Sequence, residues 1–340
     1  MSTMDLARRT TADPLLRLLS HAFATTYHRP PEAVWRAPYA FRVSASAVPS
    51  GPPRTGTGPP GDWFAAAGHY VDVAVAPRAD GMLRCASLNH PAEDAELPLT
   101  GPAVRAPAWA ARPYAALRTL AAAGCGRGGA DLQLNAPLPE SVGLPVAEPL
   151  ECAVALAVAD AHAGRGAGAP TRAQLARLLG AAVPGDNGLR RAVLFARAGH
   201  LLAADGRTHQ PLRTPEGAAD PCLLLLTARP APGEDPDTSK PAAATAAPAG
   251  TAALAATATP AATGSRSATG LATAVREALG AGAVSAWWPG TRPGRGVLLL
   301  VPADRRAAVR AAAVEAFLRC DLPVPRVLRI TLAAAARREG

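Results

Sequence analysis

The chain has 340 residues and a formal net charge of +9, with 49% hydrophobic and 18% charged residues. This length is enough for two domains with buried cores. The positive charge comes from scattered arginines with few aromatic residues between them, and Lys240 is the only lysine. We therefore expect no nucleic-acid partner, because such proteins combine a clustered basic surface with stacking side chains.

The cysteines and the N-terminus restrict the location of the protein. Five widely spaced cysteines, an odd number, predict reduced core residues of a cytoplasmic protein. They form no Cys-x-x-Cys or His/Cys cluster, so we expect no metal site. No apolar segment reaches the ~20 residues of a membrane span, and residues 1–9 lack the apolar continuation of a signal peptide. We expect a monomer that does not enter a membrane.

The first predicted elements are a helix and a hairpin. Asp13 is a suitable N-cap and Pro14 a suitable first residue for a helix with a broad apolar face. The Pro/Gly-rich residues 49–61 predict an exposed loop. Residues 70–76 alternate between valine and other residues, and together with residues 82–86 they predict a β-hairpin.

Residues 129–158 form the most informative stretch. Leu132 and Leu134 alternate with polar residues, prolines and a glycine then break the strand, and an apolar helix runs from Leu150 towards Asp160. A strand that leads into a helix N-terminus is a common anion site, because free N–H groups and the helix dipole favour negative charge. A plain turn into a core helix explains the same residues.

The second half of the chain changes composition abruptly. Thr171 begins a capping box, and residues 201–204 and 222–227 read as buried strands. Residues 230–267 are almost entirely Ala, Thr, Pro and Gly, which predicts a disordered linker. A globular pattern then returns, with a ferredoxin-like order of elements: helix 271–279, strand 284–288, strand 297–301, helix 304–319 and strand 326–332.

The segment Pro139-x-x-x-Gly143-Leu144, followed by Leu150-Glu151, resembles the second motif of the galactokinase branch of the GHMP small-molecule kinases. Segments similar to other parts of these kinases occur in the same order along about two thirds of the chain. The resemblance implies an α+β, two-lobed fold with an N-terminal mixed sheet and a C-terminal ferredoxin-like layer. It also implies ATP-dependent sugar phosphorylation, with ATP and Mg²⁺ as cofactors if activity remains.

The resemblance also divides the chain into parts. We expect an N-terminal lobe at residues 1–215, a strand of the C-terminal lobe at 216–229, the linker at 230–267 and the C-terminal lobe at 268–340.

The nucleotide loop departs from the family pattern. Its remnants are Ser141, at the position of a glycine, and Gly143, Leu144 and Glu151. The family's three serines are replaced by residues 145–147. Pro145 has no N–H to offer an anion, and Glu148 adds a carboxylate that repels phosphate.

The catalytic positions also depart. The family's Gly-Arg-Val-Asn after Ala-Pro is replaced by residues 39–42, Tyr-Ala-Phe-Arg. Arg191 stands at the position of the catalytic aspartate, and an arginine cannot act as a general base. Asp186 is the nearest substitute in sequence. We therefore predict no catalytic residue and no metal ligand.

The third motif keeps Gly290 and Gly294 but gains bulky neighbours. We expect Trp287 and Trp288 before it to be core or lobe-interface residues. Three polar residues lie outside the first motif: His69, Tyr70 and Asp72. We interpret them as surface residues whose polar groups have hydrogen-bond partners, and not as sugar ligands.

These departures leave three hypotheses. In the first, a galactokinase-like protein has lost phosphoryl transfer. In the second, it is an active sugar kinase with a relocated site. In the third, it is a regulatory protein that binds a sugar or a small anionic metabolite in a cleft made cationic by four arginines: Arg190, Arg191, Arg292 and Arg295. The alternative to such a cleft is that these arginines are solvated.

Overall fold

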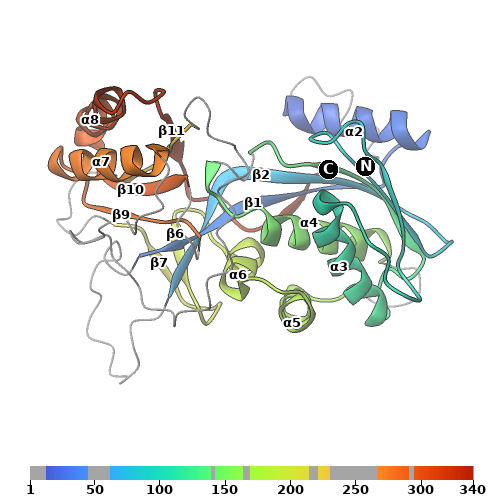
Figure 1. Cartoon of the computed structure of the whole chain (residues 1–340). Coiled ribbons are helices and arrows are strands. Elements are labelled where there is room, and N and C mark those ends of the chain that lie inside the picture. Colours follow the sequence, from blue (N-terminus) through green and yellow to red (C-terminus); the bar gives the residue numbers. More distant parts are fainter. Residues whose placement is uncertain are drawn as a thin grey trace.

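The computed structural model describes residues 13–44, 62–138, 142–163, 169–213, 221–229, 266–290 and 295–339. These residues form two sheets, each covered by helices (Figure 1). The fold is α+β, as predicted, with a mixed N-terminal sheet and a C-terminal layer of two helices on an antiparallel sheet. We call the first sheet with its helices the first lobe, and the second sheet with its helices the second lobe. The predicted loop at 49–61 and the predicted linker, apart from residues 266–267, lie outside the described residues.

The first sheet contains eight strands in the order β12-β1-β2-β5-β3-β4, and β6 and β7 extend it from β2. Its pairings are antiparallel except that between β3 and β5, which is parallel. The strands are β1 (Ala33–Val43), β2 (Trp63–Pro77), β3 (Met82–Ser87), β4 (Ala95–Pro98), β5 (Gly129–Asn135), β6 (His200–Ala203), β7 (His209–Pro211) and β12 (Arg337–Glu339).

Helices cover both faces of this sheet (Figure 1). On one face lies α2 (Pro14–Tyr27), which begins at its predicted cap, since Asp13 accepts a hydrogen bond from the N–H of Leu15 at 3.0 Å. The helices of the other face are α3 (Ala108–Ala122), α4 (Ala147–Ala161), α5 (Arg172–Ala182) and α6 (Asn187–Phe195). The predicted capping box of α5 is present at Thr171. The central helix, α4, begins three residues earlier than predicted and is buried on nearly all sides.

The predicted hairpin between residues 70–76 and 82–86 is wrong. Strand β5 lies between β2 and β3 and pairs with both. Its start fits closely against β3, because a Cβ atom on Gly129 (φ 94°) would lie 2.1 Å from the carbonyl oxygen of Met82. Because β5 is buried along its whole length, inserting it removes more apolar surface from water than a local hairpin would. Local alternation cannot reveal such an insertion.

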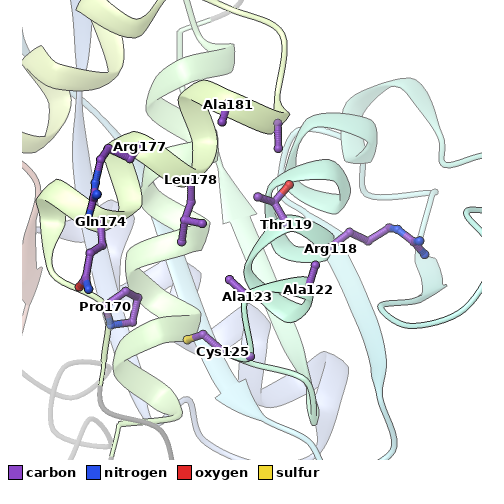
Figure 2. Close-up of a pocket in the computed structure, with 12 residues that line it drawn as sticks. Arg118, Thr119, Ala122, Ala123, Cys125, Pro170, Gln174, Arg177, Leu178 and Ala181 are labelled. Carbon is purple, nitrogen blue, oxygen red and sulfur yellow. The ribbon is translucent and has the colours of Figure 1, made fainter.

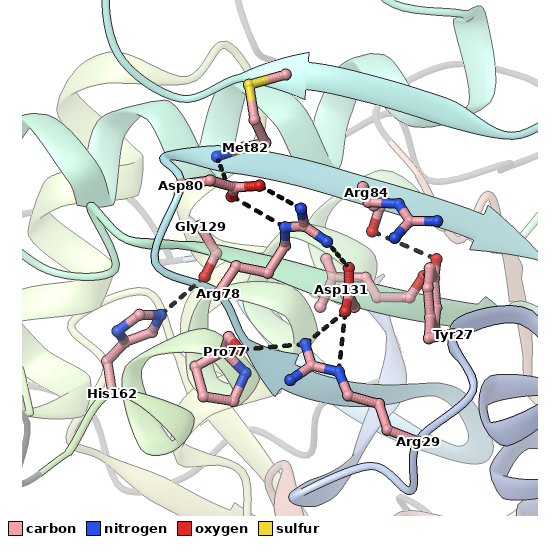
Figure 3. Close-up of polar contacts among 11 residues, drawn as sticks. Tyr27, Arg29, Pro77, Arg78, Asp80, Met82, Arg84, Gly129, Asp131 and His162 are labelled. Carbon is pink, nitrogen blue, oxygen red and sulfur yellow. Dashed lines mark hydrogen bonds and ion pairs between the residues drawn. The ribbon is translucent and has the colours of Figure 1, made fainter.

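Buried Asp131 holds the start of β5 in place (Figure 3). Its carboxylate accepts hydrogen bonds from Arg29, which follows α2, at 3.1 Å, and from Arg78, which follows β2, at 2.9 Å. The ring of His162 at the end of α4 bonds to the carbonyl of Gly129 at 2.9 Å. Segments from three parts of the chain are therefore fixed to one strand end.

The second sheet has four antiparallel strands in the order β11-β8-β10-β9. Two helices pack on one face of it (Figure 1). The order helix, strand, strand, helix, strand agrees with the prediction for the last segment. The elements are β8 (Pro221–Thr227), α7 (Arg266–Gly280), β9 (Ser285–Trp287), β10 (Gly296–Pro302), η3 (Ala303–Arg305), α8 (Arg306–Arg319) and β11 (Arg326–Ile330).

The end of the chain returns to the first lobe. Residues 337–339, which the predicted boundaries assign to the C-terminal lobe, form β12 and pair with β1. Apart from this strand, the domain limits stay a prediction. None of the helices that the structure describes has the length and apolar composition of a membrane-spanning segment.

Candidate functional site

The turn before α4 packs directly against the second lobe. Gly143 has a φ of 93°, and a Cβ atom there would lie 2.8 Å from the Cα atom of Gly296 at the start of β10. The hydroxyl of Thr227 in β8 donates to the carbonyl of Val142 at 3.1 Å, and Leu144 is buried. The retained glycine therefore lets two backbones touch at the junction of the lobes. Two further predicted remnants lie outside the described residues: Ser141 and Gly294.

The N-terminus of α4 lacks one of the hydrogen-bond donors that a helix end usually offers. A helix offers unpaired N–H groups in its first turn, which is what makes it an anion site. Here Pro149 lacks the N–H of the third helical position, and Pro145, just before the cap residue Val146, also has none. The carboxylate of Glu148, 6% exposed, lies in the same turn. This turn therefore opposes a phosphate through missing donors and through like charge.

Asp186 contacts Glu148 of this turn through its N–H, and both of its carboxylate oxygens are in use. It caps α6 by accepting from the N–H of Gly188 at 2.8 Å, and its other oxygen accepts from Nε of Arg42 at 2.8 Å. Its own N–H donates to Oε1 of Glu148 at 3.0 Å. Arg42 also pairs with Asp62 at 3.0 Å. One guanidinium thus pairs with two carboxylates, so the cluster keeps an excess of negative charge.

Arg42 also joins the two lobes. Its N–H donates to the carbonyl of Pro289 at 2.8 Å, and its carbonyl accepts from the indole N–H of Trp287 at 2.7 Å. Trp287 is buried at the junction, as predicted, and Trp288 packs against the core of the second lobe. We did not single out Arg42 from the sequence. The available signal was a charged residue inside an otherwise apolar strand.

Glu151 is buried with no exposed side-chain surface and holds three helices together. It forms ion pairs with Arg190 of α6 at 2.9 Å and with Arg112 of α3 at 2.8 Å. Burial raises the pKa of the Glu151 carboxyl, and the two guanidinium groups oppose this shift. Glu151 therefore has a structural role, because it is enclosed by helices and joins them through ion pairs.

The four arginines expected at a cationic cleft are dispersed. Arg190 is 1% exposed and committed to Glu151. Arg191 donates to the carbonyl of Ala204 after β6, so the residue at the family's aspartate position is tied to the first sheet. Arg295 is half-buried, and Arg292 lies outside the described residues.

The expectation that His69, Tyr70 and Asp72 are surface groups is wrong for Asp72. This carboxylate has no exposed surface and pairs with Nε of Arg36 at 2.8 Å. Burial raises its pKa, although Arg36 opposes the shift. The helix α2 and its cap residue Asp13 cover the sheet at Asp72, and Asp13 forms a second ion pair with Arg36. The sequence did not reveal this burial because it depends on where α2 packs.

The residues that replace the first motif form ordinary sheet. Strand β1 continues through Tyr39 to Val43 and stays paired with β2, with one register shift after Pro38. Tyr39 is buried, and its hydroxyl donates to the carbonyl of Leu138 at 2.9 Å. Its side chain thus fills the space beside the β5–α4 connection.

A cavity of about 900 Å³ lies elsewhere in the first lobe, between α3 and α5 (Figure 2). Its lining is mainly small and apolar and includes Ala122, Ala123 and Leu178. The guanidinium of Arg118 on its rim is committed to the carbonyl of Gly101 at 2.8 Å. The cavity lacks the converging polar groups that define a catalytic pocket.

The described residues at the α4 N-terminus fit the phosphates of the implied nucleotide poorly. In the described ranges, no group of three or more His, Cys, Asp or Glu side chains could hold a metal ion. The α4 N-terminus offers a proline and a buried carboxylate where phosphate would need donors.

Comparison with known proteins shows what the architecture is. The structure of Lactococcus lactis galactokinase complexed with galactose superposes with a TM-score of 0.62 at 13% identity, covering 95% of this chain and 99% of that chain. The D-glycero-D-manno-heptose 1-phosphate kinase of Bacteriodes thetaiotaomicron gives 0.53 at 10% identity, covering 91% and 99%. Homoserine kinase of Cytophaga hutchinsonii gives 0.52 at 12% identity, covering 90% and 97%. The chain has the GHMP-kinase fold.

The GHMP-kinase fold extends over nearly the whole chain, whereas sequence comparison gives no assignment. No protein-family model matches, and no curated protein sequence matches. At 10–13% identity the likeness concerns the fold alone, and function has to be argued from the site.

Proposed function

We propose that this chain is a galactokinase-like protein of the GHMP-kinase fold that does not transfer phosphate. The turn at the α4 N-terminus carries the proposal. Pro145 and Pro149 remove N–H donors there, and Glu148 places a carboxylate in the first turn. Phosphoryl transfer depends on positioned donors and cations around the transferring group, so their loss removes the main catalytic effect.

The remaining motif positions support the same proposal. Arg191, at the family's aspartate position, bonds to a strand end and cannot accept a proton from a sugar hydroxyl. The galactokinase branch is supported by the motif segments around Gly143 and Pro38 and by the TM-score of 0.62 with a galactokinase.

The test is a coupled ADP-release assay on the full-length chain with Mg-ATP and a panel of hexoses that includes galactose. A galactokinase assayed in parallel is the positive control. We expect turnover at the background rate with every sugar. Turnover well above background would refute the proposal. Calorimetric titration with Mg-ATP, galactose and sugar phosphates then shows whether a non-catalytic ligand site exists.

A relocated kinase site is the second candidate, and one observation favours it. Asp186 contacts the first turn of α4, since its N–H donates to Glu148, and Arg42 pairs with its carboxylate. If the ADP assay shows turnover, Asp186→Asn should abolish it, because the amide cannot accept a proton. Asp205→Asn, in the exposed β6–β7 turn, is the matched control.

A further inference from the structure

A second cavity, of about 640 Å³, lies in the second lobe between α8 and the edge strand β11. Its lining includes seven residues of α8, all on one side of the helix: Arg306, Ala307, Arg310, Ala311, Val314, Glu315 and Leu318. They extend from the first to the thirteenth residue of α8, so the groove is about 18 Å long at 1.5 Å per residue. A groove of this length and shape suits an elongated segment.

The floor of this α8–β11 groove is apolar and incompletely covered. Val327 of β11 and Val314 of α8 are half-buried in this groove. Leu224 of β8 also lines the groove but is 3% exposed and belongs to the core under α7 and α8. Leu318 is 57% exposed on the helix side. The two helices thus cover the inner face of the sheet except along β11. One more helix beside α8 would complete the layer, since packed helices lie about 8–10 Å apart.

The rim of the groove is basic. Arg306 and Arg310 lie one turn apart on α8, and Arg329 lies opposite on β11. In the described part of the chain, none of these three side chains has an ion-pair partner. Glu315 is the acidic residue in the lining, so the groove carries an excess of positive charge. Apolar residues between unpaired arginines are complementary to a helix with one apolar face and acidic edges.

We propose that the α8–β11 groove is a docking site for an acidic amphipathic helix of a partner protein. The helix places its apolar residues on Val314, Leu318 and Val327 and its carboxylates against the arginines of the rim. The groove has no aromatic residue in its lining, which disfavours single-stranded nucleic acid as the occupant. The site lies in the second lobe, and its occupancy does not depend on phosphoryl transfer.

The test uses the full-length chain and a fluorescein-labelled helical peptide of about 14 residues, long enough to span the groove. Its sequence places leucines at i, i+3, i+4 and i+7, glutamates beside them, and alanines and glutamines on the outer face, so that like charges do not unfold the helix. We expect saturable fluorescence anisotropy at micromolar protein. A peptide of scrambled order and a lysine version of the peptide should not bind. Binding should weaken several-fold between about 0.05 and 0.3 M salt.

Charge reversal locates the site. The double variant Arg306→Glu/Arg310→Glu should weaken peptide binding at least tenfold, because two attractive charge contacts become repulsive. Arg276→Glu, at an exposed position of α7 outside the groove, is the matched control and should change affinity less than about twofold. Leu318→Ser tests the apolar floor at an exposed position and should also weaken binding. Circular dichroism verifies that each variant is folded.

Four results would overturn the proposal. The first two are that the acidic peptide does not bind and that the lysine peptide binds equally well. The third is that the double variant binds with unchanged affinity. The fourth is that dodecanoate or an oligonucleotide displaces the peptide at a lower concentration than unlabelled peptide does. A photoreactive peptide whose crosslinks map between residues 306 and 329 supports it, and crosslinks confined to the α3–α5 cavity contradict it.

Discussion

Replacing Glu151 by alanine should destabilise the first lobe by about 3–5 kcal/mol, the range for breaking a buried ion pair from one side. Arg190 is 1% exposed, and its guanidinium also donates to Asn187 and to the carbonyls of Val183 and Pro184. It stays in place and stays charged, because arginine does not deprotonate in proteins. The variant therefore leaves a buried positive charge without a counterion.

Two further variants separate charge from packing at Glu151. Glu151→Gln keeps the size and one acceptor oxygen, so it should cost less, about 1.5–3 kcal/mol, the contribution of a hydrogen bond to a charged group. The double variant Glu151→Met/Arg190→Met removes both charges and should be more stable than Glu151→Ala alone. Glu277→Ala is the control, since it pairs at 3.0 Å with an exposed Arg319 and should cost less than about 1 kcal/mol.

The assay is urea unfolding at pH 7, followed by far-UV circular dichroism and tryptophan fluorescence. The reasoning is refuted if Glu151→Ala costs no more than Glu277→Ala. It is also refuted if the double methionine variant is less stable than Glu151→Ala, because the penalty would then come from lost packing and not from the unpaired charge.

Two other predictions concern backbone fit and titration. Gly143→Ala should destabilise more than Gly101→Ala: both have positive φ, costing about 1–3 kcal/mol, but only at residue 143 does the new Cβ lie 2.8 Å from Gly296. Equal losses in urea unfolding would show that the backbones do not touch. The Asp80 carboxyl should titrate at about pH 2 by NMR, because hydrogen bonding from Arg78 lowers its pKa. Its contribution to stability is thus present above about pH 4 and lost as the pH falls through 2. Arg78→Ala should return the pKa towards 3.8, and an unchanged pKa would contradict the assignment.

Local chemistry made part of the fold predictable. Asp13 with Pro14 fixes the start of α2, and Thr171 with Gln174 fixes the start of α5, because caps depend on residues within one turn. The order of elements after residue 268 followed from the change of hydrophobic period along the chain.

Contacts between distant segments were not predictable from local pattern. The insertion of β5 between β2 and β3 depends on backbone fit, and the pairing of residues 337–339 with β1 joins opposite ends of the chain. At the site, Arg42 and Asp186 are 144 positions apart. Arg42 lies in the segment that replaces the first motif and Asp186 lies outside the motifs, so only the folded chain reveals that they pair.

The motif residues that this chain keeps differ in physical role from those it has replaced. Gly143 allows contact with Gly296, Leu144 is buried, and Glu151 binds two arginines. Each would be required by packing even if no nucleotide bound. The replaced residues include position 145, where proline removes an N–H that only an external anion would use. A site that still bound phosphate would need the opposite pattern, with its donors intact. The division between kept and replaced positions therefore follows stability, as the proposed loss of phosphoryl transfer requires.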